Sequence, residues 1–132
     1  MKLLVDASVA VAASANPLGF ARFRRYDLLA PPLMWIEAQS ALHATLWRGE
    51  LHREQVEPMR SRILNAPVQR VESAELVDEV WKVADELSWA RTYDANYVAP
   101  ARLLNCRVVT LDRRLRRGTE RLGFVVGPTE LD

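Results

Sequence analysis

The sequence predicts a parallel three-layer α/β sandwich, in which helices cover both faces of a central sheet. Two apolar runs of the same design, Leu3 to Val5 and Arg107 to Leu111, are each followed at once by an aspartate. Near-continuous apolar runs are typical of parallel strands that are covered on both faces. Strand-like and helix-like segments alternate along nearly the whole chain, with connections long enough for right-handed crossovers. We therefore expect a single α/β domain over residues 1–132.

Composition supports one globular domain and excludes several classes of protein. Of the 132 residues, 49% are apolar, which is enough for a substantial core. The 18 basic and 17 acidic residues nearly cancel, so any nucleic-acid site must be local. Cys106 is the single cysteine, which rules out a disulfide framework and a cysteine-built zinc site. No apolar run approaches the length of a signal peptide core or a membrane span, so we expect a cytoplasmic protein.

Prolines and asparagines divide the first half of the chain into strand and helix units. Asn16 and Pro17 are typical of a helix start, and Pro31 with Pro32 ends a strand because proline cannot donate to a ladder. Pro58 is expected to bend or restart the helix that contains it. The predicted elements are a helix over 7–15, a second helix from 16 to about 27, a strand over 28–30, and helices over 33–48 and 51–65.

The second half alternates in the same way. Residues 67–71 are a candidate edge strand, and Ser73 caps an amphipathic helix whose apolar face runs from Leu76 to Leu87. Thr92 is expected to cap the next helix, which ends at Leu104 before Asn105. The remaining predicted elements are the strand over 107–111, an arginine-rich helix over 113–122 and a last strand over 124–126.

Four carboxylates can meet at one edge of this sheet. Asp6 and Asp112 each follow a strand, and ligands of open α/β sheets bind beyond the strands' carboxyl ends. Asp94 begins the helix that leads into the Asp112 strand, and Glu37 lies near the start of the helix after the two prolines. Acids at helix starts are also favoured by the helix dipole, so spacing alone leaves a purely structural role open for each of them.

The chemistry of such a cluster favours a hard metal ion. Four carboxylates raise one another's pKa unless a cation compensates them. Ligands that are all oxygen favour Mg²⁺ or Mn²⁺ over zinc. Such an ion activates water for phosphodiester hydrolysis. Ser8 and Thr110 each lie two residues from a strand-end acid and can orient carboxylates or hold water.

Four motifs, taken in order, resemble a known family. They are Leu-Leu-Val-Asp6-Ala-Ser8, Pro-Pro-Leu-Met-Trp-Ile-Glu37-Ala, Thr92-Tyr-Asp94-Ala-Asn-Tyr-Val-Ala and Val-Val-Thr110-Leu-Asp112-Arg-Arg-Leu. Together they resemble the PIN-domain family, specifically the VapC-type toxins of bacterial toxin–antitoxin pairs, over essentially the whole chain. The resemblance implies a PIN-like fold with a five-stranded parallel sheet. It also implies a Mg²⁺- or Mn²⁺-dependent endoribonuclease that cleaves single-stranded or loop RNA.

The resemblance also implies roles for particular residues. Asp6, Glu37, Asp94 and Asp112 match the family's acidic quartet, with Asp6, Asp94 and Asp112 as metal ligands and Glu37 binding directly or through water. Ser8 and Thr110 match its hydroxyl positions. The implied partners are a second copy of the chain and an antitoxin, whose carboxy-terminal segment lies across the active groove.

The residues that would contact RNA phosphates are harder to identify. Arg91, Arg113 and Arg114 are candidates because they neighbour the acids. Arginines on a solvated helix face are the alternative, and the four tryptophans are expected to be core or interface residues. A non-catalytic binding module of the same fold, acting through a protein partner, is the alternative function.

Overall fold

A five-stranded parallel sheet forms the centre of the molecule. The computed structural model describes residues 1–131, and its strands are β1 (Lys2–Val5), β2 (Asp27–Ala30), β3 (Val68–Arg70), β4 (Arg107–Val109) and β5 (Val125–Val126). They are ordered β3-β2-β1-β4-β5, and every neighbouring pair is parallel. The predicted α/β class and the five-stranded sheet implied by the resemblance are both confirmed, with β3 at the edge.

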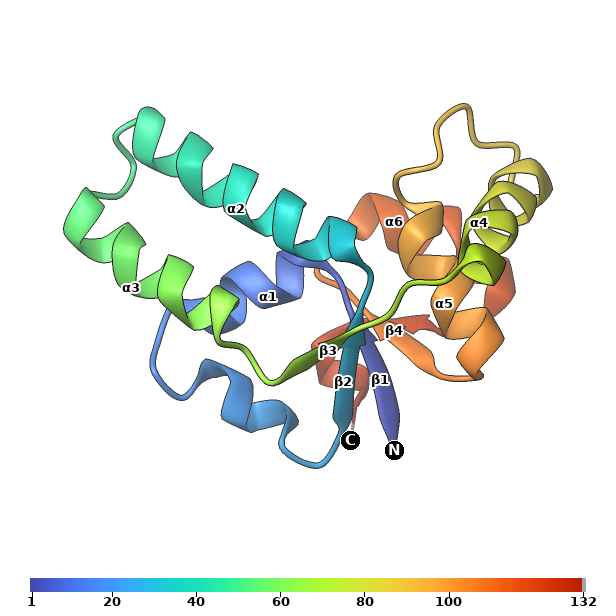
Figure 1. Ribbon diagram of the computed structural model, residues 1–132, viewed down its shortest axis with the longest axis horizontal. Helices are drawn as coiled ribbons and strands as arrows, with labels where there is room; N and C mark the ends of the chain where they lie inside the picture. The colour runs from blue at the N-terminus through green and yellow to red at the C-terminus, as the bar shows by residue number, and fades with distance from the viewer. Residues whose placement is uncertain (132) are drawn as a thin grey trace.

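Helices lie on both sides of this sheet (Figure 1). On one side are α1 (Ala7–Ser14), α2 (Pro32–Trp47) and α3 (Arg53–Leu64), with α2 and α3 forming a projecting hairpin. On the other side, α4 (Ala74–Glu86) packs on α5 (Ala95–Leu104), which contacts β1 and β4. The short helix α6 (Arg113–Gly118) follows β4. Within residues 1–131, no helix is both long enough and apolar enough to cross a membrane.

The core explains why the strand sequences are apolar without interruption. Leu3, Leu4 and Val5 of β1 and Val108 and Val109 of β4 have no exposed surface, because helices cover both faces of the sheet. Each such side chain contributes about 1.5–3 kcal/mol through burial. A smaller apolar cluster joins α4 to α5 through Val83, Ala84, Ala95, Val98 and Ala99.

The strand order reverses between β1 and β4, which creates a crevice at their carboxyl ends. The chain adds β2 and β3 on one side of β1 and then crosses back to place β4 on the other side. Val5 pairs with Val109, so Asp6 and Thr110 leave the sheet at the same level. The backbone amide of Asp6 still donates to the Val109 carbonyl at 3.4 Å.

The helix predicted over 16–27 is wrong. The structure has a short 3₁₀ helix, η1 (Gly19–Phe23), and the chain has already entered β2 at Asp27. Asn16 Oδ1 accepts from the Leu18 amide at 3.0 Å, which makes a turn instead of a helix cap. Gly19 packs so closely on the end of α1 that a Cβ atom there would lie 1.6 Å from the Ala13 carbonyl oxygen.

Several predicted boundaries also shift in the second half. Asp94, not Thr92, occupies the N-cap position of α5. The helix predicted to reach residue 122 ends at Gly118, where Thr119 leaves the helical conformation and its hydroxyl bonds back to the Leu115 carbonyl at 2.7 Å. A separate 3₁₀ turn, η2 (Glu120–Leu122), follows, and a third, η3 (Pro128–Glu130), comes after β5. The strand predicted over 107–111 ends at Val109.

Two further expectations concern side-chain types. Pro58 does not restart α3, which runs as one helix through it. Of the two predicted roles, core or interface, the core role is wrong for Trp47 and Trp81, which are 84% and 68% exposed, and the interface role stays a prediction. Trp35 is partly buried, and the guanidinium of Arg70 lies 4.9 Å from the centre of its ring.

Candidate active site

Asp6 lies at the centre of a buried hydrogen-bond network. Its Oδ1 accepts from the Val9 amide at 3.1 Å, which caps α1, and from the Ser8 hydroxyl at 2.6 Å. Its Oδ2 accepts from the Thr110 hydroxyl. Burial raises the pKa of the Asp6 carboxyl, and the three hydrogen bonds only partly oppose this shift. The side chain is 4% exposed, so a buried carboxylate is held in one orientation.

The two hydroxyls also fix the chain after β4. Ser8 Oγ accepts from the Leu111 amide at 2.9 Å, and Thr110 Oγ1 accepts from the Asp112 amide at 2.9 Å. Thr110 has no exposed surface. Ser8 and Thr110 therefore connect Asp6 to the backbone that carries Asp112, which is the geometry expected of residues that orient carboxylates.

Asp112 and Asp94 meet across the side chain of Arg114. Asp112 Oδ1 caps α6 through the amides of Arg114 and Leu115, at 2.9 and 3.2 Å. Its Oδ2 lies 3.8 Å from Arg114 Nη2, and Asp94 Oδ2 lies 3.7 Å from the same atom. Asp94 makes no capping hydrogen bond with its side chain. Capping thus accounts for one oxygen of Asp112 and does not account for Asp94.

Burial raises the pKa of the Asp94 carboxyl, while the charge of Arg114 lowers it and that of Asp112 raises it further. A carboxylate that pays a desolvation cost without a capping bond is unusual for a surface helix start. Helix capping therefore does not explain the position of Asp94, whose carboxylate lies 3.7 Å from the Arg114 guanidinium.

Glu37 has a partner that the sequence did not reveal. The Tyr97 hydroxyl donates to Glu37 Oε1, and Tyr97 is 3% exposed on α5. The pKa of Glu37 is raised, chiefly by burial and then by Asp94, Asp6 and Asp112, while the Tyr97 hydrogen bond lowers it. Burial and the Glu37 charge raise the pKa of Tyr97 far above its usual range, so it remains a hydrogen-bond donor.

A signal for Tyr97 was available in the sequence. It lies three residues after Asp94, so the two side chains project from neighbouring positions of one helix turn. In the structure it is a hydroxyl-bearing residue among the buried positions of α5, where a polar atom requires a partner; the identity of that partner depends on tertiary packing.

All four acids line one cavity of about 370 Å³. Asp6 enters from the end of β1, Glu37 from α2, Asp94 from the start of α5 and Asp112 from the start of α6. Ala41, one turn after Glu37, lies on the same wall, which keeps the space open. The four acidic side chains therefore lie together at the carboxyl edge of the sheet, as the sequence predicts.

The donor set fits a hard cation by type, but its side chains are not yet gathered around one point. Among residues 1–131, no three His, Cys, Asp or Glu side chains are arranged to hold an ion as they stand. The oxygens of Asp6 bond to hydroxyls, Asp112 bonds to α6, and Arg114 lies between Asp94 and Asp112. Taking up an ion would require Arg114 to withdraw, which is feasible because its side chain is 76% exposed.

The three candidate arginines lie in different places. Arg114 lines the carboxylate cavity and also an adjoining cavity of about 560 Å³, which Arg91 lines as well. Arg113 is exposed and lines neither of these two cavities. Two of the three candidates are therefore beside the acids.

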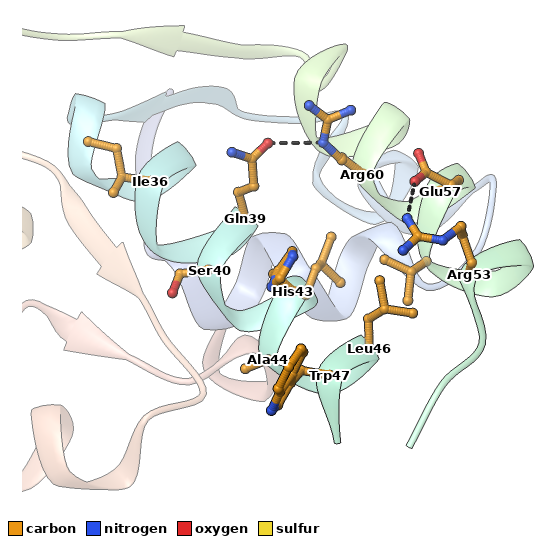
Figure 2. Close-up of a pocket in the computed structure, with 12 residues that line it drawn as sticks. Ile36, Gln39, Ser40, His43, Ala44, Leu46, Trp47, Arg53, Glu57 and Arg60 are labelled. Carbon is orange, nitrogen blue, oxygen red and sulfur yellow. Dashed lines mark hydrogen bonds and ion pairs between the residues drawn. The ribbon is translucent and has the colours of Figure 1, made fainter. Parts of the chain in front are cut away.

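A larger groove of about 680 Å³ lies between α2 and α3 (Figure 2). Ile36 and Trp47 of α2 line it and are 64% and 84% exposed. Its other wall comes from α3, where Arg60 Nε donates to Gln39 Oε1 at 3.0 Å across the groove. Glu37 and Ala41 belong to the neighbouring face of α2, so the groove and the carboxylate cavity share this helix.

Comparison with known proteins gives consistent results at the levels of sequence and fold. Residues 3–120 match the PIN domain family. A VapC ribonuclease of Mycobacterium bovis and Ribonuclease VapC9 of Mycobacterium tuberculosis are 35% identical over 115 residues, which is 86% of this chain and 87% of theirs.

Two solved structures share the fold. The crystal structure of PAE2754 from Pyrobaculum aerophilum has a TM-score of 0.79 and 27% identity, covering 99% of this chain and 86% of that one. A chain of a toxin–antitoxin complex from Klebsiella pneumoniae has a TM-score of 0.66, covering 96% of this chain and 98% of that one. Because the sequence identity with this second chain is only 14%, the similarity supports a shared fold and nothing more.

Proposed function

The chain belongs to the PIN domain family, and from this membership we propose that it is a metal-dependent endoribonuclease, the toxin of a toxin–antitoxin pair. The relatives that are 35% identical over 86% of the chain bear the name VapC ribonuclease. One observation supports the activity above all others: Asp6, Glu37, Asp94 and Asp112 line the same cavity at the switch point of the sheet.

The proposal includes Mg²⁺ or Mn²⁺, held by Asp6, Asp94 and Asp112. When bound, such a cation neutralises charge on the scissile phosphodiester and supplies an activated water. Support comes from the donor chemistry, because the cavity offers carboxylate and hydroxyl oxygens and no sulfur or imidazole. It also comes from the raised pKa values of the Asp6 and Asp94 carboxyls, since a cation relieves the cost of burying charge.

Other residues of the cavity have separate roles in the proposed reaction. Ser8 and Thr110 hold Asp6 in one orientation. Tyr97 occupies Oε1 of Glu37 and leaves Oε2 to accept a proton from the attacking water. A raised pKa makes Glu37 a better base, because efficient proton transfer needs a pKa closer to the working pH. Arg114 moves from the acids to a substrate phosphate.

The antitoxin, in this proposal, occupies the groove between α2 and α3. Ile36 and Trp47 offer exposed apolar surface there, and such patches are typical of binding sites. Ile36 in this groove and Glu37 in the carboxylate cavity are consecutive residues of α2, so a segment that lies in the groove would pass close to the acids. The homodimer implied by the family resemblance remains a prediction.

The test compares RNA cleavage with and without divalent metal. We expect a labelled single-stranded RNA of mixed sequence to be cut in Mg²⁺ or Mn²⁺ and left intact in excess chelator. Cleavage that persists in chelator would disprove metal dependence. A folded protein that binds metal and cuts no single-stranded or hairpin RNA would favour the non-catalytic binding module.

A further inference from the structure

A second cavity adjoins the carboxylate cavity on the side of the α4–α5 connection. It has a volume of about 560 Å³ and shares Glu37, Asp94, Arg114 and Leu115 with the first cavity. Its remaining lining comes mainly from residues 88–93, the loop that projects between α4 and α5 in Figure 1. A molecule that reaches the acids can therefore extend into this space without leaving the protein surface.

The wall of this second cavity is fixed by a helix-ending motif. Ser88 has a left-handed backbone with φ of 57°, which is disfavoured for serine, and its amide donates to Asp85. The Trp89 amide donates to the Ala84 carbonyl at 2.9 Å, which completes a Schellman motif. Gly118 lies behind the Trp89 ring, where an added Cβ would be 3.4 Å from Cζ2. Trp89 thus forms a rigid side of the cavity.

The side chains of Tyr93 and Arg91 in this loop make no hydrogen bond, ion pair or ring contact with the described part of the chain. Tyr93 is 58% exposed, and its ring and hydroxyl have no partner within residues 1–131. Arg91 is exposed and forms no ion pair or hydrogen bond in the described part of the chain. An exposed ring and an unpaired guanidinium that line one cavity are available to a ligand.

We propose that this second cavity binds the nucleotide next to the scissile phosphate, with its unpaired base stacked on Tyr93 and its phosphate paired with Arg91. Proteins recognise single-stranded RNA by stacking bases on aromatic rings and by pairing phosphates with arginine. The volume lies within the range of small-ligand pockets. The inference rests on the proposed ribonuclease function, because the acids at the mouth of the cavity define where the scissile bond lies.

The base contact is tested by binding measured in chelator and at low salt, where the proposed activity is off. The probes are a short labelled single-stranded RNA and an abasic oligonucleotide of the same length. We expect Tyr93→Ala to weaken binding of the RNA by about 5- to 100-fold and binding of the abasic probe hardly at all. Tyr93→Phe keeps the ring and should behave as the wild type. Trp81→Ala, which removes an exposed ring of α4 that lines neither cavity, is the matched control.

The phosphate contact is tested by the salt dependence of binding. Each phosphate of a single-stranded RNA that is neutralised by a protein cation contributes about −0.7 to the slope of log affinity against log salt concentration. Arg91→Gln should reduce that slope by about this amount, whereas Arg24→Gln, an exposed arginine outside both cavities, should leave it unchanged.

The outcomes separate this proposal from the function on which it rests. If the wild type cuts RNA but Tyr93→Ala binds RNA and abasic probe as the wild type does, the nucleotide site is wrong and the nuclease stands. Failure of the wild type to bind RNA in chelator also overturns the site. If the wild type binds with the expected dependence on Tyr93 and Arg91 but cuts nothing in metal, the nuclease is wrong and the RNA site stands.

Discussion

The hydroxyl of Tyr97 donates a hydrogen bond to the carboxylate of Glu37, which joins α5 to α2 across the candidate active site. The two residues are 60 positions apart, and Tyr97 is nearly fully buried. This contact fixes one oxygen of Glu37, whose side chain lines the same cavity as the other three acids. Tyr97 is therefore a positioning residue for the proposed base.

Tyr97→Phe is expected to slow RNA cleavage by about 10- to 100-fold, because Glu37 loses the bond that orients it. The ring still packs, so the free energy of unfolding should fall by only about 1–3 kcal/mol. The measurement is kcat and KM for one RNA substrate, with urea unfolding alongside. Equal rates for Tyr97→Phe and the wild type would show that Glu37 does not depend on this contact.

Asp94→Asn is expected to raise the melting temperature of the metal-free protein at neutral pH. The pKa of the Asp94 carboxyl is raised above its ordinary value of 3.8, so the folded state retains a proton that the unfolded state releases. This group therefore lowers stability as pH rises from about 4 through its folded pKa. The melting-temperature difference between variant and wild type should grow over that range in chelator. A variant less stable than the wild type throughout would indicate a capping role.

The sheet and the meeting of the acids were predictable, whereas their fine contacts were not. The apolar runs before Asp6 and Asp112 indicate buried parallel strands, and carboxyl ends of parallel strands meet at one edge. The turn at Gly19 depends on tertiary packing against α1, which no local pattern contains. The Tyr97 bond to Glu37 depends on how α2 and α5 sit on the sheet.

Thr110→Val is expected to destabilise the protein by about 2–4 kcal/mol, because a fully buried hydroxyl both donates to Asp6 and accepts from the Asp112 amide. The two side chains have nearly the same shape, so packing is retained. Urea unfolding measures the effect, and Thr129→Val, at an exposed position, is the control. A loss no greater than that of the control would mean that the Asp6 network adds no stability.

Arg114→Gln is expected to tighten Mn²⁺ binding a few-fold, since the guanidinium lies 3.7 and 3.8 Å from two proposed ligands and competes with the ion. The effect is small because an exposed ion pair contributes about 0.2–1 kcal/mol. Calorimetric titration without RNA measures it. Arg113→Gln, which removes a neighbouring charge that lines neither cavity, should leave the affinity unchanged. Equal affinities for the two variants would exclude this competition.

The most direct test of the account is RNA cleavage by Asp6→Asn and Asp94→Asn in Mn²⁺, beside the wild type. Both residues line the carboxylate cavity, and each variant keeps a side chain of the same shape. We predict that the wild type cuts single-stranded RNA, that each variant falls by at least about 100-fold, and that near-ultraviolet circular dichroism shows all three folded. Cleavage by either folded variant at close to the wild-type rate would contradict the claim that these carboxylates form the active centre.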